Sequence, residues 1–113
     1  MIGMFATYVD PSARESVGAV LDSTFLSEGV KVRAFEDALA QKFDIPRPIA
    51  LNSGSTALEL ALELAGIAPG DEVITSPQTF IATGIAILRQ GAVPVFADIE
   101  YDTGNIDPDS VQK

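Results

Sequence analysis

The sequence predicts an α/β fold in which short, mainly parallel strands alternate with flanking helices. Two observations point to it. Three short apolar runs, at residues 49–51, 72–75 and 92–99, lie between prolines, glycines and polar residues, which is typical of buried strands. Two segments with apolar residues at helical spacing, 55–65 and 79–90, separate these runs. Strands that alternate with helices favour a parallel sheet with both faces covered.

Two further helices are expected before the first strand. Asp10 and Pro11 form an N-terminal capping pattern, and we expect a helix over residues 12–22. Residues 27–29 (Ser-Glu-Gly) predict a turn. Residues 30–43 then carry apolar side chains at helical spacing, and two prolines soon afterwards end that helix. The expected order is helix, helix, strand, helix, strand, helix, strand.

Composition excludes several classes of function. The 113 residues correspond to about one domain and carry 7 basic and 16 acidic side chains, for a net charge of -9. Scattered Lys and Arg on so acidic a chain argue against a nucleic-acid partner. Without Cys or His, these residues form no disulfide or zinc finger and support no histidine-based mechanism. We find no signal peptide and no apolar run of about 18 residues, so we expect a cytoplasmic protein without a membrane span.

The two apolar helices predict that more protein or a partner subunit covers them. Segment 55–65 carries two charges, both glutamates, and segment 79–88 carries none. Helices that are apolar nearly all round lie in the interior of something large. Asp107 and Pro108 predict the start of a helix close to the end of the sequence. We therefore expect a homo-oligomer and a chain truncated at its C-terminus. The alternative for the last residues is a frayed polar tail.

The sharpest signal for a binding site is residues 52–57 (Asn-Ser-Gly-Ser-Thr-Ala), which follow an expected strand and begin a helix. Gly54 can take unusual backbone angles and lets a ligand approach closely. Free amides at Ser55, Thr56 and Ala57, with two hydroxyls, would form a phosphate cradle at the helix N-terminus. An ordinary Ser N-cap with a glycine turn explains the pattern equally well. It is neither a P-loop nor a Rossmann fingerprint, so a nucleotide-binding domain is disfavoured.

Two other features could bind a ligand. Phe80 comes just beyond the second expected strand, where open α/β sheets bind ligands, and its ring could stack on a flat cofactor. The alternative for Phe80 is a core residue. An acidic segment is similar to a calcium loop, but its glycine, Gly104, comes one position late, so a solvated strand end that leads to a helix cap is the better explanation. No metal site and no catalytic residue are assigned. The acidic residues are Asp98, Glu100, Asp102, Asp107 and Asp109.

Seven short motifs follow one another in order between residues 25 and 107, and the ordered set is specific although each motif alone is weak. They are residues 26–29, 32–36, 50–58, 69–74, 79–83, 91–99 and 105–107. With this set, the chain resembles the N-terminal part of the DegT/DnrJ/StrS family of aminotransferases. That family uses pyridoxal 5'-phosphate and has the three-layer fold of aspartate aminotransferase, fold type I.

The resemblance implies a domain organisation. Residues 1–29 would form an N-terminal helical segment. Residues 30–113 would form part of the pyridoxal-phosphate-binding large domain, with βαβαβ order, truncated at the C-terminus. The turn at residues 26–29 would border the sugar site.

The resemblance also implies how the cofactor is bound. Gly54, Ser55 and Thr56 would hold the phosphate of pyridoxal 5'-phosphate, and Phe80 would stack on its pyridine ring. These are the residues that the local pattern already indicates as a phosphate cradle and an aromatic platform.

The implied activity is transfer of an amino group from an amino acid such as glutamate to a keto sugar attached to a nucleotide, in a dimer. The family's Schiff-base lysine lies beyond residue 113, and Lys31, Lys42 and Lys113 do not match its context. We therefore expect the chain alone to be inactive. Some relatives replace that lysine and catalyse dehydration, so the reaction class stays open. The alternative function is a non-enzymatic α/β module for oligomerisation or phosphate binding.

Overall fold

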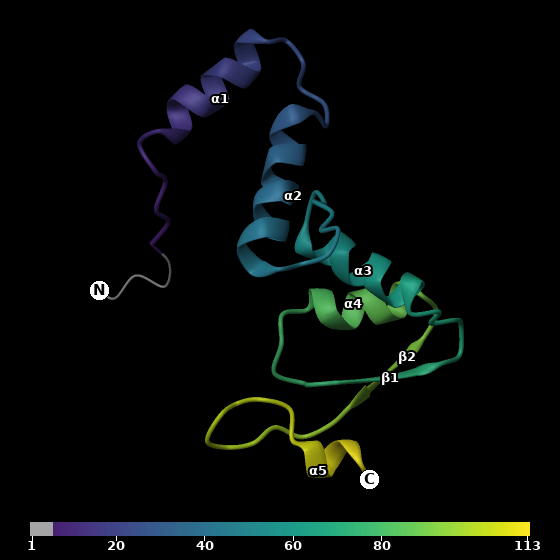
Figure 1. Cartoon of the computed structure of the whole chain (residues 1–113). Coiled ribbons are helices and arrows are strands. Elements are labelled where there is room, and N and C mark those ends of the chain that lie inside the picture. Colours follow the sequence, from purple (N-terminus) through teal and green to yellow (C-terminus); the bar gives the residue numbers. More distant parts are fainter. Residues whose placement is uncertain (1–5) are drawn as a thin grey trace. The chain divides into compact units, whose positions relative to one another are not determined.

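The computed structural model describes residues 6–113, labelled by element in Figure 1. These residues fall into two compact units, one ending at Ala50 and the other running from Leu51 to Lys113. Each unit is described separately below. Within the described residues, no helix is long and apolar enough to cross a membrane.

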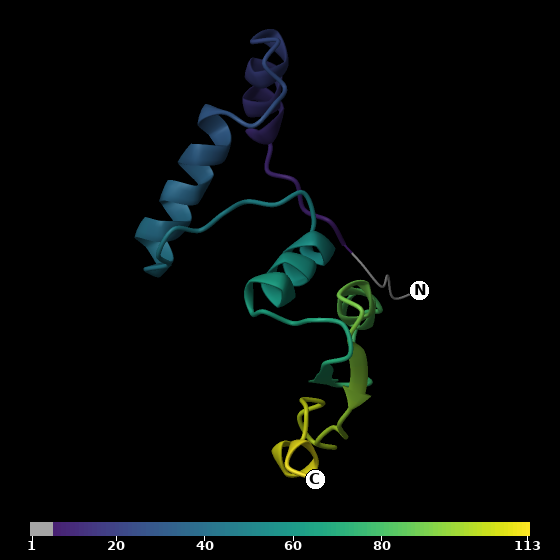
Figure 2. The ribbon, with the colours of Figure 1, turned by 90° about the vertical axis from the view of Figure 1, so that its right-hand side faces the viewer.

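The first unit contains two helices, α1 (Ala13–Asp22) and α2 (Val30–Phe43), joined by a turn (Figure 2). Both helices were predicted, and α2 has the predicted bounds. The Asp10 carboxylate accepts hydrogen bonds from the Ser12 amide and hydroxyl just before α1, at 2.9 and 2.6 Å. No residue of either helix is buried. The apolar side chains of this unit are therefore exposed or only partly buried within the described residues.

The strand expected at residues 49–51 does not form, and that prediction is wrong for this structure. Ile49 is 73% exposed, and none of these residues pairs with a strand. The Ala50 amide donates instead to Glu36 Oε1 of α2 at 2.8 Å. A strand needs a neighbour for its ladder, and the two strands that do form within residues 6–113 pair with each other. The expected βαβαβ order is thus βαβ here.

The second unit contains that βαβ arrangement. Strands β1 (Glu72–Thr75) and β2 (Val93–Phe96) are parallel, with Thr75 opposite Phe96, and α4 (Ala82–Arg89) connects them. Helix α3 (Gly54–Leu64) comes before β1, and the short helix α5 (Pro108–Val111) comes last. The predicted strand at 72–75 is confirmed. The other predicted strand is shorter than 92–99, and α4 begins at Ala82 rather than at residue 79, since residues 79–81 are irregular.

The core of this unit is small. Ile87 of α4 is 2% exposed and is its largest fully buried side chain. The other buried residues are Thr75, Ala86, Ala92 and Ala97. Helix α3 contributes no buried residue, and Leu64 and Leu88 are 80% and 60% exposed. The described residues therefore leave much of the apolar surface of α3 and α4 uncovered.

The loop that leads from α4 to β2 packs closely against the loop before β1. The Gly70 amide donates to the Gly91 carbonyl at 3.0 Å. Gly91 has a φ of +73°, and a Cβ there would lie 3.1 Å from the Pro69 Cβ. Only glycine meets both conditions without strain. This contact fixes where β2 begins beside β1.

Candidate functional site

The first turn of α3 has two backbone amides without a partner. Ser53 is the N-cap, and its Oγ accepts a hydrogen bond from the Thr56 amide at 3.1 Å. The Ala57 amide donates to the Ser53 carbonyl at 3.1 Å. Within the described residues, the amides of Gly54 and Ser55 make no hydrogen bond. The expectation of free amides at Thr56 and Ala57 is therefore wrong, because Ser53 occupies both. The free pair, Gly54 and Ser55, lies two residues earlier in the same turn.

Gly54 keeps this helix end open. It is the first residue of α3, with helical rather than left-handed backbone angles. The structure therefore does not use the conformational freedom that the sequence suggested. Nothing lies within 4 Å of a Cβ placed at Gly54. The missing side chain leaves space beside the free amides, and the first turn contains no acidic residue to repel an anion.

Phe80 lies on the surface. It is 77% exposed, so the alternative of a core phenylalanine is wrong within this chain. Its carbonyl accepts a hydrogen bond from the Thr83 amide at 3.0 Å. The hydroxyls of Thr79 and Thr83 are 3.0 Å apart across the same turn. The ring is thus free to contact a flat group, while the backbone around it is tied to the start of α4.

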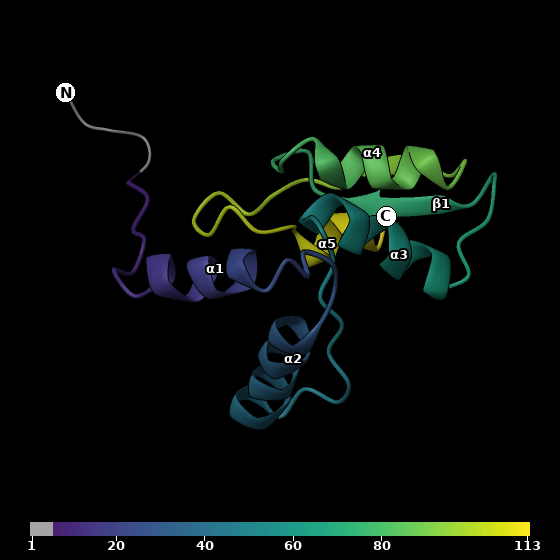
Figure 3. The same ribbon diagram turned by 90° about the horizontal axis from the view of Figure 1, so that it is seen from above.

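These features lie at the same end of the second unit. Figures 1 and 3 show α3 and α4 side by side, both starting at the end where β1 finishes. The carboxyl ends of parallel strands and the N-termini of the following helices are where open α/β sheets bind ligands. The amides of Gly54 and Ser55 and the turn that holds Phe80 therefore face the same end. Ser55 and Thr56 are partly exposed there.

Sequence reasoning offered a serine N-cap here as an alternative, and it missed the role of Thr83 beside Phe80. Ser53 orders the first turn of α3, and the Thr83 hydroxyl links Thr79 to α4. A serine directly before a helix start is a recognisable N-cap signal. A threonine pair across a turn has no such signature.

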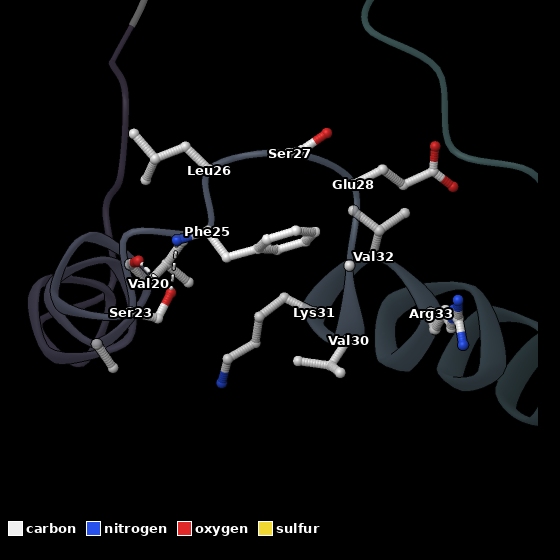
Figure 4. A pocket seen from close by; sticks show the side chains of 12 residues that line it. Val20, Ser23, Phe25, Leu26, Ser27, Glu28, Val30, Lys31, Val32 and Arg33 are labelled. Carbon is white, nitrogen blue, oxygen red and sulfur yellow. Dashed lines mark hydrogen bonds between the residues drawn. The ribbon is translucent and has the colours of Figure 1, made fainter.

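The turn at residues 26–29 borders an open hollow in the first unit, with a volume of about 670 Å³. Figure 4 shows the Phe25 ring on the inner side of this turn, while Leu26 and Ser27 point away from it. A Cβ at Gly29 would lie 2.9 Å from Phe25 Cε1, so the ring would have to shift to admit a side chain there. Lys31 also lines the hollow. Its lining combines the Phe25 ring with the cations of Lys31 and Arg33 and the carboxylate of Glu28.

The acidic segment forms a closed loop. Ile99 and Ile106 form an antiparallel bridge, and the Glu100 amide donates to the Asn105 carbonyl at 2.8 Å. Asp107 caps α5 by accepting a hydrogen bond from the Asp109 amide at 2.9 Å, so the predicted cap is confirmed. Within residues 6–113, no group of three or more acidic residues is close enough together to hold a metal ion.

A model of the DegT/DnrJ/EryC1/StrS aminotransferase family matches residues 8–113. The chain belongs to this family. The spore coat polysaccharide biosynthesis protein SpsC of Bacillus subtilis (strain 168) is 50% identical over 94 residues, which are 83% of this chain and 24% of SpsC. GDP-perosamine synthase of Caulobacter vibrioides is 39% identical over 94% of this chain and 29% of its own length. The chain thus spans about a quarter of the length of these relatives.

Solved structures agree with this assignment. Spr1654 of Streptococcus pneumoniae, known in PLP and PMP forms, matches 98% of this chain and 28% of its own, with 32% identity and a TM-score of 0.91. NtdA of Bacillus subtilis, solved with PMP, has a TM-score of 0.83 and 34% identity, over 88% of this chain and 23% of its own. The fold is therefore the N-terminal part of the fold type I architecture, as predicted. The family's cofactor is pyridoxal phosphate, also as predicted.

Proposed function

We propose that this chain forms the phosphate-binding and ring-stacking part of the cofactor site of a sugar aminotransferase. The main support for this proposal is the geometry at the start of α3. It offers two unpartnered amides at Gly54 and Ser55, open space beside Gly54 and no acidic residue in the first turn. A phosphate dianion is stabilised by such amides and by the helix dipole. The residues present therefore fit the phosphate of pyridoxal phosphate.

Each residue has a distinct role in the proposal. The amides of Gly54 and Ser55 donate to phosphate oxygens, and the hydroxyls of Ser55 and Thr56 add further donors. Thr56 Oγ1 already lies 3.0 Å from Ser53 Oγ, which orients it. The exposed Phe80 ring supports the face of the cofactor ring. When bound, pyridoxal phosphate supplies the electron sink for amino transfer, and these residues hold and orient it.

The proposed reaction of the whole enzyme moves an amino group from an amino acid to a keto sugar attached to a nucleotide. The names of two relatives, GDP-perosamine synthase and dTDP-3-amino-3,4,6-trideoxy-alpha-D-glucose transaminase, support a nucleotide sugar. The hollow beside residues 26–29 supports a contact with that substrate from the first unit. In this proposal residues 1–29 are a helical segment and residues 30–113 belong to the cofactor-binding domain of a cytoplasmic dimer.

The proposal assigns no Schiff-base lysine to these residues. Lys31 lines the hollow of the first unit, Lys42 lies over the ring of Phe43, and Lys113 is the last residue. Lys31 and Lys42 belong to the first unit and Lys113 follows α5, and none of the three matches the sequence context of the family's Schiff-base lysine. We therefore expect the chain alone to bind the cofactor without catalysing transamination.

The test is a fluorescence titration with pyridoxamine phosphate, which has no aldehyde and so cannot react with lysine. Pyridoxamine, which lacks the phosphate, is the matched probe. We expect the phosphate-bearing probe to bind at least about tenfold more tightly, because each charge-assisted hydrogen bond adds about 1.5–3 kcal/mol. Equal affinity for both probes would contradict a phosphate site at α3.

One observation favours the second candidate, a non-enzymatic oligomerisation module. Leu64 of α3 and Leu88 of α4 are 80% and 60% exposed. Exposed apolar surface of this kind marks contact with another chain. Light scattering would report oligomers in either case. A chain that oligomerises but binds neither probe would favour the module over the enzyme part.

A further inference from the structure

Two hydrogen bonds of Thr83 hold the segment around Phe80 just before α4. The Thr83 amide donates to the Phe80 carbonyl at 3.0 Å. The Thr83 hydroxyl lies 3.0 Å from the hydroxyl of Thr79, the residue on the other side of Phe80. Thr83 therefore holds Phe80 both directly and through its neighbour.

Packing does not hold the Phe80 ring, because the side chain is 77% exposed. Its direction depends on the backbone of residues 79–81, which are not part of a helix. Earlier in the same loop, the Gln78 amide donates a hydrogen bond to Ser76 Oγ at 3.1 Å. The threonine pair is thus the side-chain contact that closes the loop around Phe80 and joins it to α4.

We propose that Thr79 and Thr83 are positioning residues that fix Phe80 in the orientation needed to stack on a flat, anionic cofactor. This inference rests on the proposed function, since it takes Phe80 as the platform. A side chain that is ordered before binding loses less conformational entropy when the ligand arrives. The pair would therefore act on affinity through Phe80, without touching the ligand.

The structure allows a clean substitution at each position. Thr83 is partly buried and borders a small hollow lined by apolar side chains such as Leu58, Leu62 and Ile87, and valine has nearly the same shape as threonine. Thr79 is exposed. The variants T79V and T83V remove one hydroxyl each and keep the shape of the side chain. T83S keeps the hydroxyl, and T7V is a control at an exposed threonine whose hydroxyl makes no hydrogen bond within residues 6–113.

The test is a double-mutant cycle on the affinity for pyridoxamine phosphate. We expect T79V and T83V each to weaken binding about three- to tenfold, because each removes the same single hydrogen bond. The double variant should bind no more weakly than either single variant. T83S and T7V should bind as the unchanged chain does. In an F80A background, T83V should have no further effect, which separates a positioning role from a general loss of structure.

Nuclear magnetic resonance gives a second measurement without any ligand. We expect the backbone order parameter of Phe80 to fall from about 0.85 toward about 0.6 in T83V, and to stay unchanged in T83S and T7V. Additive effects of T79V and T83V, an effect of T83V that persists without Phe80, or an unchanged order parameter would each overturn the inference. If the unchanged chain binds no pyridoxamine phosphate, the proposed function fails, and the order parameter still decides whether the threonine pair fixes Phe80.

Discussion

The Oγ of Ser53 accepts a hydrogen bond from the Thr56 amide at 3.1 Å and thereby determines which amides of α3 remain free. An α-helix leaves its first amides without intrahelical partners. The Ser53 side chain accepts a hydrogen bond from the Thr56 amide, and the Ser53 carbonyl accepts one from the Ala57 amide. The amides of Gly54 and Ser55 remain for a ligand. In the proposed site, capping falls to Ser53 and anion binding to the amides of Gly54 and Ser55 in the same turn, although the sequence presented the two roles as alternatives.

This division predicts opposite effects for two neighbouring serines. The variant S53A removes the cap and should lower the free energy of unfolding by about 1 kcal/mol. S55A removes a hydroxyl that makes no hydrogen bond within the described residues, so its stability should change by less than about 0.5 kcal/mol. Urea unfolding followed by circular dichroism measures both. In the titration, S55A should weaken binding of pyridoxamine phosphate. Equal stability losses in the two variants would contradict the division.

The exposed ring of Phe80 predicts a loss of binding without a loss of stability. F80A should change the free energy of unfolding by less than about 0.5 kcal/mol, since the side chain is 77% exposed. It should weaken binding of pyridoxamine phosphate by about threefold or more, from the loss of aromatic contact. Y101A removes another fully exposed aromatic side chain and serves as the control. A similar change in affinity for both variants would refute the stacking role.

The small core predicts a large effect from Ile87. The side chain is 2% exposed, so I87A should lower the free energy of unfolding by about 2–5 kcal/mol, or leave the second unit unfolded. I81A makes the same chemical change at a side chain that is 69% exposed, and we expect a change below about 0.5 kcal/mol. Thermal unfolding of both variants tests this. Comparable losses would show that the core lies elsewhere.

The start of α1 predicts a pH dependence. Hydrogen bonds from the Ser12 hydroxyl and then from the Ser12 amide lower the pKa of Asp10 below its ordinary value. A lowered pKa means that the charged carboxylate stabilises the fold. That contribution is present above the ordinary pKa of Asp and is lost as the pH falls through the lowered one. Carbon-detected titration of the carboxyl group should show a low pKa that rises in S12A. A pKa that does not move in S12A would contradict this cause.

The positions of prolines and glycines along the sequence allowed much of the fold to be predicted. The bounds of α2 and β1 came directly from the prolines and glycines that flank them. The strand expected at residues 49–51 failed because a strand depends on a distant partner, which composition cannot supply. The Ala50 amide bonds to Glu36 instead, and nothing in the sequence marks that pair.

The site was predictable in kind but not in detail. The six residues 52–57 indicated a phosphate cradle, and the ordered motifs indicated the cofactor. Which amides stay free depends on the geometry of Ser53, and the exposure of Phe80 depends on how little of this chain packs against it. Both are tertiary properties, which spacing along the sequence does not determine.

The central claim is that this chain holds pyridoxal phosphate by its phosphate and ring, and not through a lysine. The most direct test is a titration with pyridoxal phosphate, followed by borohydride reduction and peptide mapping by mass spectrometry. We predict saturable binding that S55A and F80A weaken, with no stoichiometric label at Lys31, Lys42 or Lys113. A stoichiometric label on one of these lysines, or no binding at all, would contradict the account.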